Sequence, residues 1–106
     1  MTEPAAGPTG PGTVVLELGA DVGALILYTP AGLDGAEIEI SCDDDPAARR
    51  RTHSQVRQRP TAIATAYAAV YPSLPAGQYT VWRDEHIPAA TATVAGGRVT
   101  SCRWPD

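Results

Sequence analysis

The chain contains no lysine and no phenylalanine, and it has only two cysteines. With aromatic residues at 6%, a core must be built mainly from Val, Ile, Leu and Ala with a few Tyr and Trp. All eight cationic residues are arginine, which we interpret as the codon bias of a GC-rich bacterial genome. Two cysteines do not make a disulfide framework, so we expect free thiols in a reducing compartment, with a Cys42–Cys102 bridge as the alternative.

Long hydrophobic runs and a basic charge balance are also missing. No segment approaches the roughly 20 consecutive apolar residues that a membrane-spanning helix needs. Residues 1–12 carry Glu3 instead of positive charge and have no apolar run, so we expect no signal peptide and a cytoplasmic location. A net charge of -4 and a pI near 5.0 argue against nucleic acid or an anionic membrane as a partner. At 106 residues the chain predicts one domain, residues 13–106, after a flexible Pro/Gly-rich arm, residues 1–12.

The segment 70–82 predicts the end of one strand, a tight corner and the start of the next. Pro75 fixes its own φ, and Gly77 can supply the positive φ that such a corner often needs. Tyr79 follows two residues later, at the position of the tyrosine in a tyrosine corner. The ring is expected inside a Greek-key sandwich, with its hydroxyl bonded to nearby backbone.

Alternating polar and apolar residues predict short strands along the rest of the chain. In residues 36–42, Ile38, Ile40 and Cys42 are expected to point inward and Glu37, Glu39 and Ser41 outward. Residues 61–71 are ambiguous because their alanines favour helix, but alternation and the following corner favour strand. The pattern predicts an all-β fold, an antiparallel Greek-key β-sandwich of seven to eight strands. The predicted strands are 13–18, 24–29, 36–42, 52–59, 61–71, 78–82, 89–94 and 98–104.

The segment Leu74-Pro-Ala-Gly-Gln-Tyr-Thr-Val81 resembles the Leu-Pro-x-Gly-x-Tyr-x-Val signature of carboxypeptidase regulatory-like and collagen-adhesin B-type domains. The resemblance covers about a tenth of the chain and implies a small prealbumin-like sandwich rather than an activity. The internal Lys–Asn isopeptide bond of the adhesin domains is excluded because the chain has no lysine. The chain as a whole also resembles small actinobacterial proteins, which implies no function.

Five of the eight arginines lie within residues 49–59, together with one histidine. Guanidinium groups suit phosphate and carboxylate, so an anionic ligand or an acidic partner can dock at this stretch. The competing interpretation is a solvated loop and edge strand, partly neutralised by the three aspartates at 43–45. The candidate binding residues are Arg49, Arg50, Arg51, His53, Arg57 and Arg59.

Neither a metal site nor catalytic machinery is predicted. The two histidines and two cysteines have no recognised metal-ligand spacing, and the serines have no nucleophile-elbow context. Glu37 and Glu39 share one face of a strand, which we interpret as a solvent-facing polar row and not as a catalytic pair. The sequence therefore predicts no enzyme and no cofactor.

The leading functional hypothesis is a non-enzymatic interaction module. It would bind a protein partner, or form a homo-oligomer, through an exposed strand edge or an aromatic–aliphatic patch around Ile26 and Tyr28. The alternative is a small anion- or metal-binding protein that uses residues 49–59. Alternation leaves the facing of Trp82 and Trp104 open between such a patch and the core.

Overall fold

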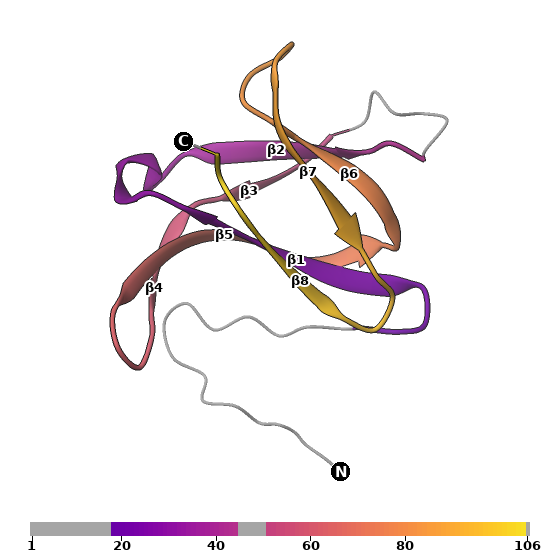
Figure 1. Ribbon diagram of the computed structural model, residues 1–106, viewed down its shortest axis with the longest axis horizontal. Helices are drawn as coiled ribbons and strands as arrows, with labels where there is room; N and C mark the ends of the chain where they lie inside the picture. The colour runs from indigo at the N-terminus through magenta and orange to yellow at the C-terminus, as the bar shows by residue number, and fades with distance from the viewer. Residues whose placement is uncertain (1–17, 45–50, 106) are drawn as a thin grey trace.

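The computed structural model describes residues 18–44 and 51–105, which form an all-β, sandwich-like domain (Figure 1). The helical part of this described chain is a single 3-10 turn, η1 (Ala31–Leu33). The predicted arm, residues 1–12, and nearly all of the predicted strand 13–18 lie outside the described residues. The strands are β1 (Val22–Thr29), β2 (Glu37–Cys42), β3 (Thr52–Gln55), β4 (Arg57–Pro60), β5 (Thr65–Pro75), β6 (Gly77–Trp82), β7 (Pro88–Val94) and β8 (Val99–Arg103).

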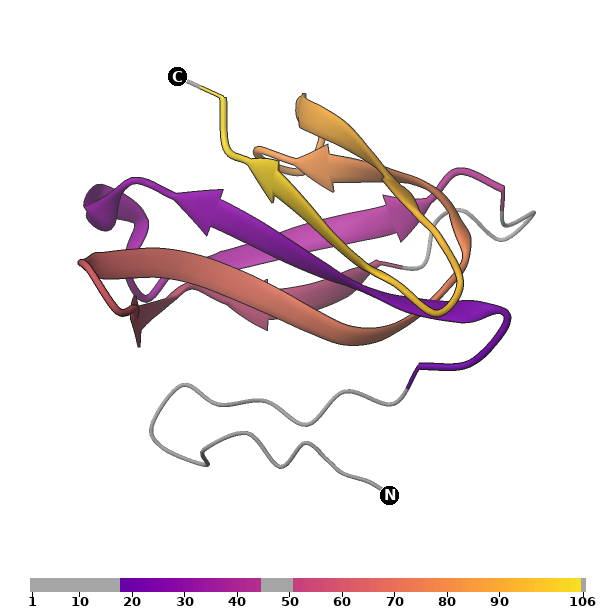
Figure 2. The ribbon, with the colours of Figure 1, turned by 60° about the horizontal axis from the view of Figure 1, so that its bottom comes forward.

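The eight strands form two sheets of four. The first sheet has the order β4-β5-β1-β8, and the second has the order β3-β2-β6-β7. Neighbouring strands are antiparallel except for β1 and β8, which run parallel. Figure 2 shows β1 in the middle of its sheet, with β5 on one side and β8 on the other. The predicted all-β class is therefore confirmed, but the prediction that all neighbouring strands are antiparallel is wrong, because β8 pairs with β1 in parallel and makes the first sheet mixed.

A single core lies between the two sheets and is built from the inward residues of both. On β2, Ile38 and Ile40 are buried while Glu37 and Glu39 are exposed, which confirms the predicted alternation there. Partly buried side chains, Cys42 among them, pack around this core. The core residues are Leu25, Leu27, Ile38, Ile40, Val56, Ala69, Tyr71, Leu74, Tyr79, Val81, Ala92 and Val94.

The predicted tyrosine corner joins β5 to β6. The Tyr79 hydroxyl donates to the Pro75 carbonyl at 2.7 Å, and the Tyr79 residue is only 3% exposed. Gly77 has a φ of +155°, which residues with a side chain rarely adopt, so the predicted positive φ is present and favours glycine there. Strand β5 begins at Thr65 rather than at residue 61, because residues 61–64 form a turn in which the Thr61 hydroxyl donates to the Ala64 carbonyl.

The predicted strand 52–59 is wrong as a single element, because the chain changes sheet in its middle. Val56 is fully buried, its N–H donates to the Ala36 carbonyl at 2.8 Å, and its carbonyl accepts from the Gly35 N–H at 2.9 Å. Burial of this one apolar side chain turns the polar run inward at Val56. Strand β3 therefore belongs to the second sheet and β4 to the first.

A buried hydrogen bond also ties the two sheets together. The Tyr71 hydroxyl, on β5, donates to the Ile38 carbonyl on β2 at 2.7 Å, and burial raises the pKa of this phenol far above its ordinary value.

Cys42 and Cys102 lie in different sheets as free thiols, and burial raises the pKa of Cys102. Within residues 18–44 and 51–105, no helix has the length and apolar character needed to cross a bilayer.

Candidate functional site

The structure divides the predicted arginine-rich stretch between the two sheets. Arg51 and His53 lie at β3, on the outer face of the second sheet, whereas Arg57 and Arg59 lie on β4 of the first sheet. Arg49 and Arg50 lie outside the described residues. The described members of the stretch therefore do not form one continuous basic surface.

Arg51 is held by contacts within the domain. Its guanidinium lies over the Trp82 ring, 4.0 Å from the ring centroid, and Nη1 donates to Glu39 Oε1 at 2.9 Å. Nη2 donates to the Glu85 carbonyl at 2.7 Å, and the side chain is only 21% exposed. A guanidinium group has several N–H donors and binds best where several acceptors face it. For Arg51 these acceptors, the Glu39 carboxylate and the Glu85 carbonyl, belong to the same chain.

Trp82 in turn covers Ser41. The indole N–H donates to Ser41 Oγ at 2.8 Å, and Ser41 is 5% exposed. Ser41 pairs with Thr80 on the outer face, as alternation predicts, and the indole of Trp82 on the neighbouring strand covers it. The sheet therefore carries a layer of side chains, Arg51 on Trp82 on Ser41, outside its own surface.

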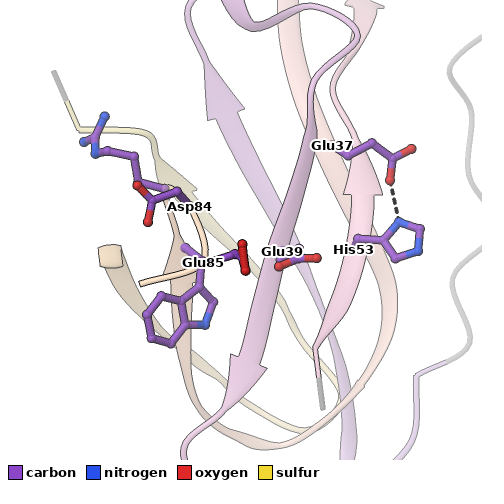
Figure 3. Close-up of a pocket in the computed structure, with 7 residues that line it drawn as sticks. Glu37, Glu39, His53, Asp84 and Glu85 are labelled. Atoms are coloured by element: carbon purple, nitrogen blue, oxygen red, sulfur yellow. Dashed lines mark hydrogen bonds and ion pairs between the residues drawn. The ribbon is translucent and has the colours of Figure 1, made fainter. Parts of the chain in front are cut away.

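Next to this stack lies an open hollow of about 470 Å³ with acidic walls (Figure 3). His53 Nδ1 lies 2.5 Å from Glu37 Oε1, and the two side chains are 65% and 58% exposed. The predicted solvent-facing row of Glu37 and Glu39 is confirmed, and each carboxylate has a basic partner. No group of three or more potential metal ligands gathers anywhere in the described part of the chain.

The turn between β6 and β7 forms one wall of this hollow. Asp84 Oδ1 accepts hydrogen bonds from the backbone N–H groups of His86 and Ile87, both at 2.8 Å. These two donors favour the ionised carboxylate and lower the pKa of Asp84. The Asp84 carboxylate therefore stabilises the turn in which it lies.

On the outer face of the first sheet, four residues form a row across all four strands. The pairing of β4 with β5 places Arg57 opposite Ala68, and the pairings of β1 place Tyr28 opposite both Ala68 and Arg103. Tyr28 is 37% exposed, and both arginines are exposed. Among the described residues, the side chains of Arg57 and Arg103 have no ion-pair or hydrogen-bond partner.

A second row is apolar. Ile26 lies opposite Val70 on β5 and opposite Ser101 on β8. Val99 lies on the same face of β8, two residues before Ser101. Neither Ile26, Val70 nor Val99 packs against the central core. We call this surface, made of Ile26, Tyr28, Val70, Val99, Arg57 and Arg103, the first-sheet face.

The first-sheet face is hollowed at one end. An open depression of about 490 Å³ lies beside Tyr28, Thr29 and Arg103 and reaches the start of β5 at Thr65. Trp104 lies next to it, half-buried against the core, with the Arg83 guanidinium 5.1 Å from its ring centroid. Both tryptophans are thus half-buried and stacked with arginine, so neither belongs to an exposed patch.

The charges of the two sheets are segregated. The strands of the first sheet contain three arginines and no acid, whereas those of the second contain two glutamates and no arginine. Sequence reasoning found Ile26 and Tyr28 but not Arg103, because only the parallel pairing of β1 with β8 brings Arg103 beside Tyr28.

No family model, curated protein or solved structure matches this chain. On the second-sheet face, Arg51 and His53 are paired with glutamates beside an open acidic hollow, whereas the first-sheet face offers the unpaired guanidinium groups of Arg57 and Arg103 beside apolar side chains.

Proposed function

We propose that this domain is a non-enzymatic interaction module whose first-sheet face binds a protein partner. The observation that carries the proposal is the row Arg57–Ala68–Tyr28–Arg103, in which an exposed aromatic ring lies between two arginines without described partners. Tyrosine and arginine are enriched in protein interfaces, where a ring supplies contact area and a guanidinium supplies several donors.

The apolar residues of the same face support a protein as the occupant. Val99 is 43% exposed, and neither Ile26 nor Val70 contributes to the core. Ile63, in the turn between β4 and β5, is 95% exposed at the end of the sheet where the hollow beside Tyr28 lies. Burial of such side chains against a partner is favourable by about 25 cal/mol for each Å² of apolar surface.

Charge complementarity indicates an acidic partner rather than a second copy packed face to face. Two first-sheet faces in contact would bring the arginines of β4 and β8 together, and like charges at an interface oppose association. A partner that presents carboxylates around an apolar strip would pair with Arg57 and Arg103 instead. Self-association through this face is therefore the less favoured form of the module.

The alternative, an anion- or metal-binding protein that uses residues 49–59, stays a prediction. The described contacts do not favour it, because Arg51 already donates to Glu39 and Glu85 and lies on Trp82. His53 is paired with Glu37 on the same face.

We also propose a Greek-key connection between the sheets. The sheet order supports this proposal. In the middle of each sheet, β5 lies beside β1 and β6 lies beside β2, and neither pair consists of strands that are consecutive in the chain. The prealbumin-like assignment and the resemblance of segment 74–81 to carboxypeptidase regulatory-like domains stay predictions.

Chemical cross-linking in the organism that makes the protein tests the proposed function. Tagged wild-type chain is expected to capture an acidic protein, and the purified pair is expected to re-form with an affinity that falls at least about tenfold for Tyr28→Asp or Arg57→Glu. Glu37→Gln, on the opposite face, is the matched control and should bind as the wild type does. Equal binding by all three variants would show that the first-sheet face is not the interface.

Light scattering over a concentration series separates the two kinds of partner. We expect the purified chain to be monomeric. A dimer that Tyr28→Asp dissociates would overturn the acidic foreign partner and assign the face to a second copy of the chain.

A further inference from the structure

We propose that the partner of the first-sheet face binds as an extended segment that adds to the free edge of β8, a proposal that rests on the proposed function. The segment would lengthen the first sheet by one strand and place alternate side chains beside Val99, Ser101 and Arg103. Strand addition of this kind combines backbone hydrogen bonds for affinity with alternate side chains for specificity.

The backbone of β8 has one free side. The Ala24 N–H donates to the Arg98 carbonyl at 3.0 Å, and the Trp104 N–H donates to the Tyr28 carbonyl at 2.8 Å. Because backbone groups alternate in direction along a strand, the even-numbered residues of this segment face β1. The N–H and C=O groups of Val99, Ser101 and Arg103 therefore point away from β1, and within the described chain no strand lies on that side of β8.

The side chains along this edge do not obstruct an incoming strand. Val99, Ser101 and Arg103 are all exposed, and all three lie on the outer face because they pair with Ala24, Ile26 and Tyr28. The strand contains no proline, and its one charge lies at its end. Proteins protect edge strands with charge, proline or short length, and β8 has little of this protection in its middle.

The other three described edges are less open. Strand β4 carries Arg57 and Arg59 within four residues and ends in Pro60, and β3 is four residues long. Strand β7 is longer, but its Thr93 carbonyl accepts a hydrogen bond from the Thr100 hydroxyl at 3.1 Å, so part of its edge is covered. Of the two edge strands of the first sheet, β4 contributes Arg57 to the first-sheet face but ends in proline, whereas β8 contributes both Val99 and Arg103.

The register along β8 defines the chemistry of the segment. A residue directly opposite Arg103 would be acidic, and a residue opposite Val99, four positions away, would be apolar, because side chains of directly paired residues lie about 4.5–5.5 Å apart. The position opposite Ser101 would be small or polar. The partner is therefore an extended segment in which an apolar residue and a carboxylate are separated by three residues.

The test uses a synthetic peptide of about nine residues with blocked ends, mainly threonine, in which a valine and a glutamate are four positions apart. A second peptide with lysine in place of the glutamate is the control. Amide hydrogen exchange of the free protein should show Ser101 and Arg103 exchanging at least about tenfold faster than Thr100 and Cys102. Addition of the glutamate peptide should slow Ser101 and Arg103 by a similar factor, and the lysine peptide should not.

Two proline variants locate the edge. Ser101→Pro removes an N–H that points away from β1, and Thr91→Pro removes the equivalent outward N–H on β7, so both are expected to fold. Peptide binding should be lost in Ser101→Pro and kept in Thr91→Pro. The reverse result would assign the edge to β7 and overturn the proposal, as would failure of the glutamate peptide to bind the wild-type chain.

A charge reversal tests the specificity. Arg103→Glu should lose the glutamate peptide and gain the lysine peptide, each by about tenfold or more. Binding that shifts the resonances of Ile26 and Tyr28 without protecting the β8 amides would overturn strand addition but leave the proposed function intact. A natural partner insensitive to Tyr28→Asp and Arg57→Glu would instead contradict the proposed function itself.

Discussion

The two outer faces of the domain place an aromatic ring and an arginine side by side, but with different contacts. On the second sheet, Arg51 lies on Trp82 and donates to Glu39, and Trp82 donates to Ser41. On the first sheet, Tyr28 and Arg103 are neighbours in register, and both are exposed. Similar side chains therefore make internal contacts on one face and are left exposed on the other.

The difference follows from where the acidic residues lie. The second sheet has its own glutamates, and the adjoining turn supplies the Glu85 carbonyl, so its arginine is satisfied internally. The first sheet has no acid among its strands, so Arg57 and Arg103 have no carboxylate partner within that sheet. This contrast yields four predictions about stability.

The largest expected difference is between Trp82→Ala and Tyr28→Ala. Loss of the indole removes the stack with Arg51 and uncovers the Ser41 hydroxyl, so the free energy of unfolding should fall by about 2–4 kcal/mol. Tyr28→Ala should lower it by about 1 kcal/mol or less, because the ring is exposed and outside the core. Urea unfolding measures both, and equal losses would contradict the assignment of different roles to the two rings.

A smaller difference is expected between Arg51→Ala and Arg103→Ala. Arg51 should contribute about 1–2 kcal/mol to the free energy of unfolding through its hydrogen bonds and its contact with Trp82. Arg103→Ala should change it by no more than about 0.5 kcal/mol, because the side chain has no described partner. A large loss in Arg103→Ala would show that the first-sheet face is also closed by internal contacts.

The turn at the second-sheet hollow should weaken in acid. The backbone donors at His86 and Ile87 lower the pKa of Asp84, so its folded-state value lies below its unfolded-state value. The stabilisation is therefore present above about pH 4 and is lost as the pH falls through the folded-state pKa. Titration of the Asp84 carboxyl by NMR checks the direction, with Asp84→Ala as the variant that lacks the effect. A pKa at or above the ordinary aspartate value would refute this account of the turn.

The smallest effect should come from the exposed pair of His53 and Glu37. Both side chains are more than half exposed, and such pairs contribute little because water screens them. Glu37→Gln should change the free energy of unfolding by about 0.5 kcal/mol or less. A larger loss would give this pair a structural role like that of Arg51 and Glu39.

Local patterns in the sequence were sufficient for most of the strands and for the corner. The Pro-x-Gly turn followed by a tyrosine predicts a contact over four residues, and Tyr79 makes that contact with Pro75. Alternation predicts the inward Ile38 and Ile40 because period-2 burial is a property of a single strand. Signals of this kind are contained within a few neighbouring residues.

Long-range contacts are what the sequence did not reveal. Val56 is the one aliphatic residue in a polar run, which is a usable signal for a change of sheet, but alternation alone makes the run one strand. The covering of Ser41 depends on Trp82, 41 residues away. The neighbourhood of Tyr28 depends on Arg103, which is still farther along the chain, in β8. The segregation of charge between sheets follows from the sheet order, which linear spacing does not encode.

The parallel pairing of β1 with β8 also has a consequence for how the domain is made. The first sheet is completed only by contacts such as Ala24 with Val99, which join the two ends of the described chain. Non-local pairings of this kind slow folding, since a long loop must close before they form. During synthesis, one edge of β1 would stay unpaired until β8 has left the ribosome. A chain terminated before β8 would therefore expose β1, in the middle of the first sheet, to aggregation.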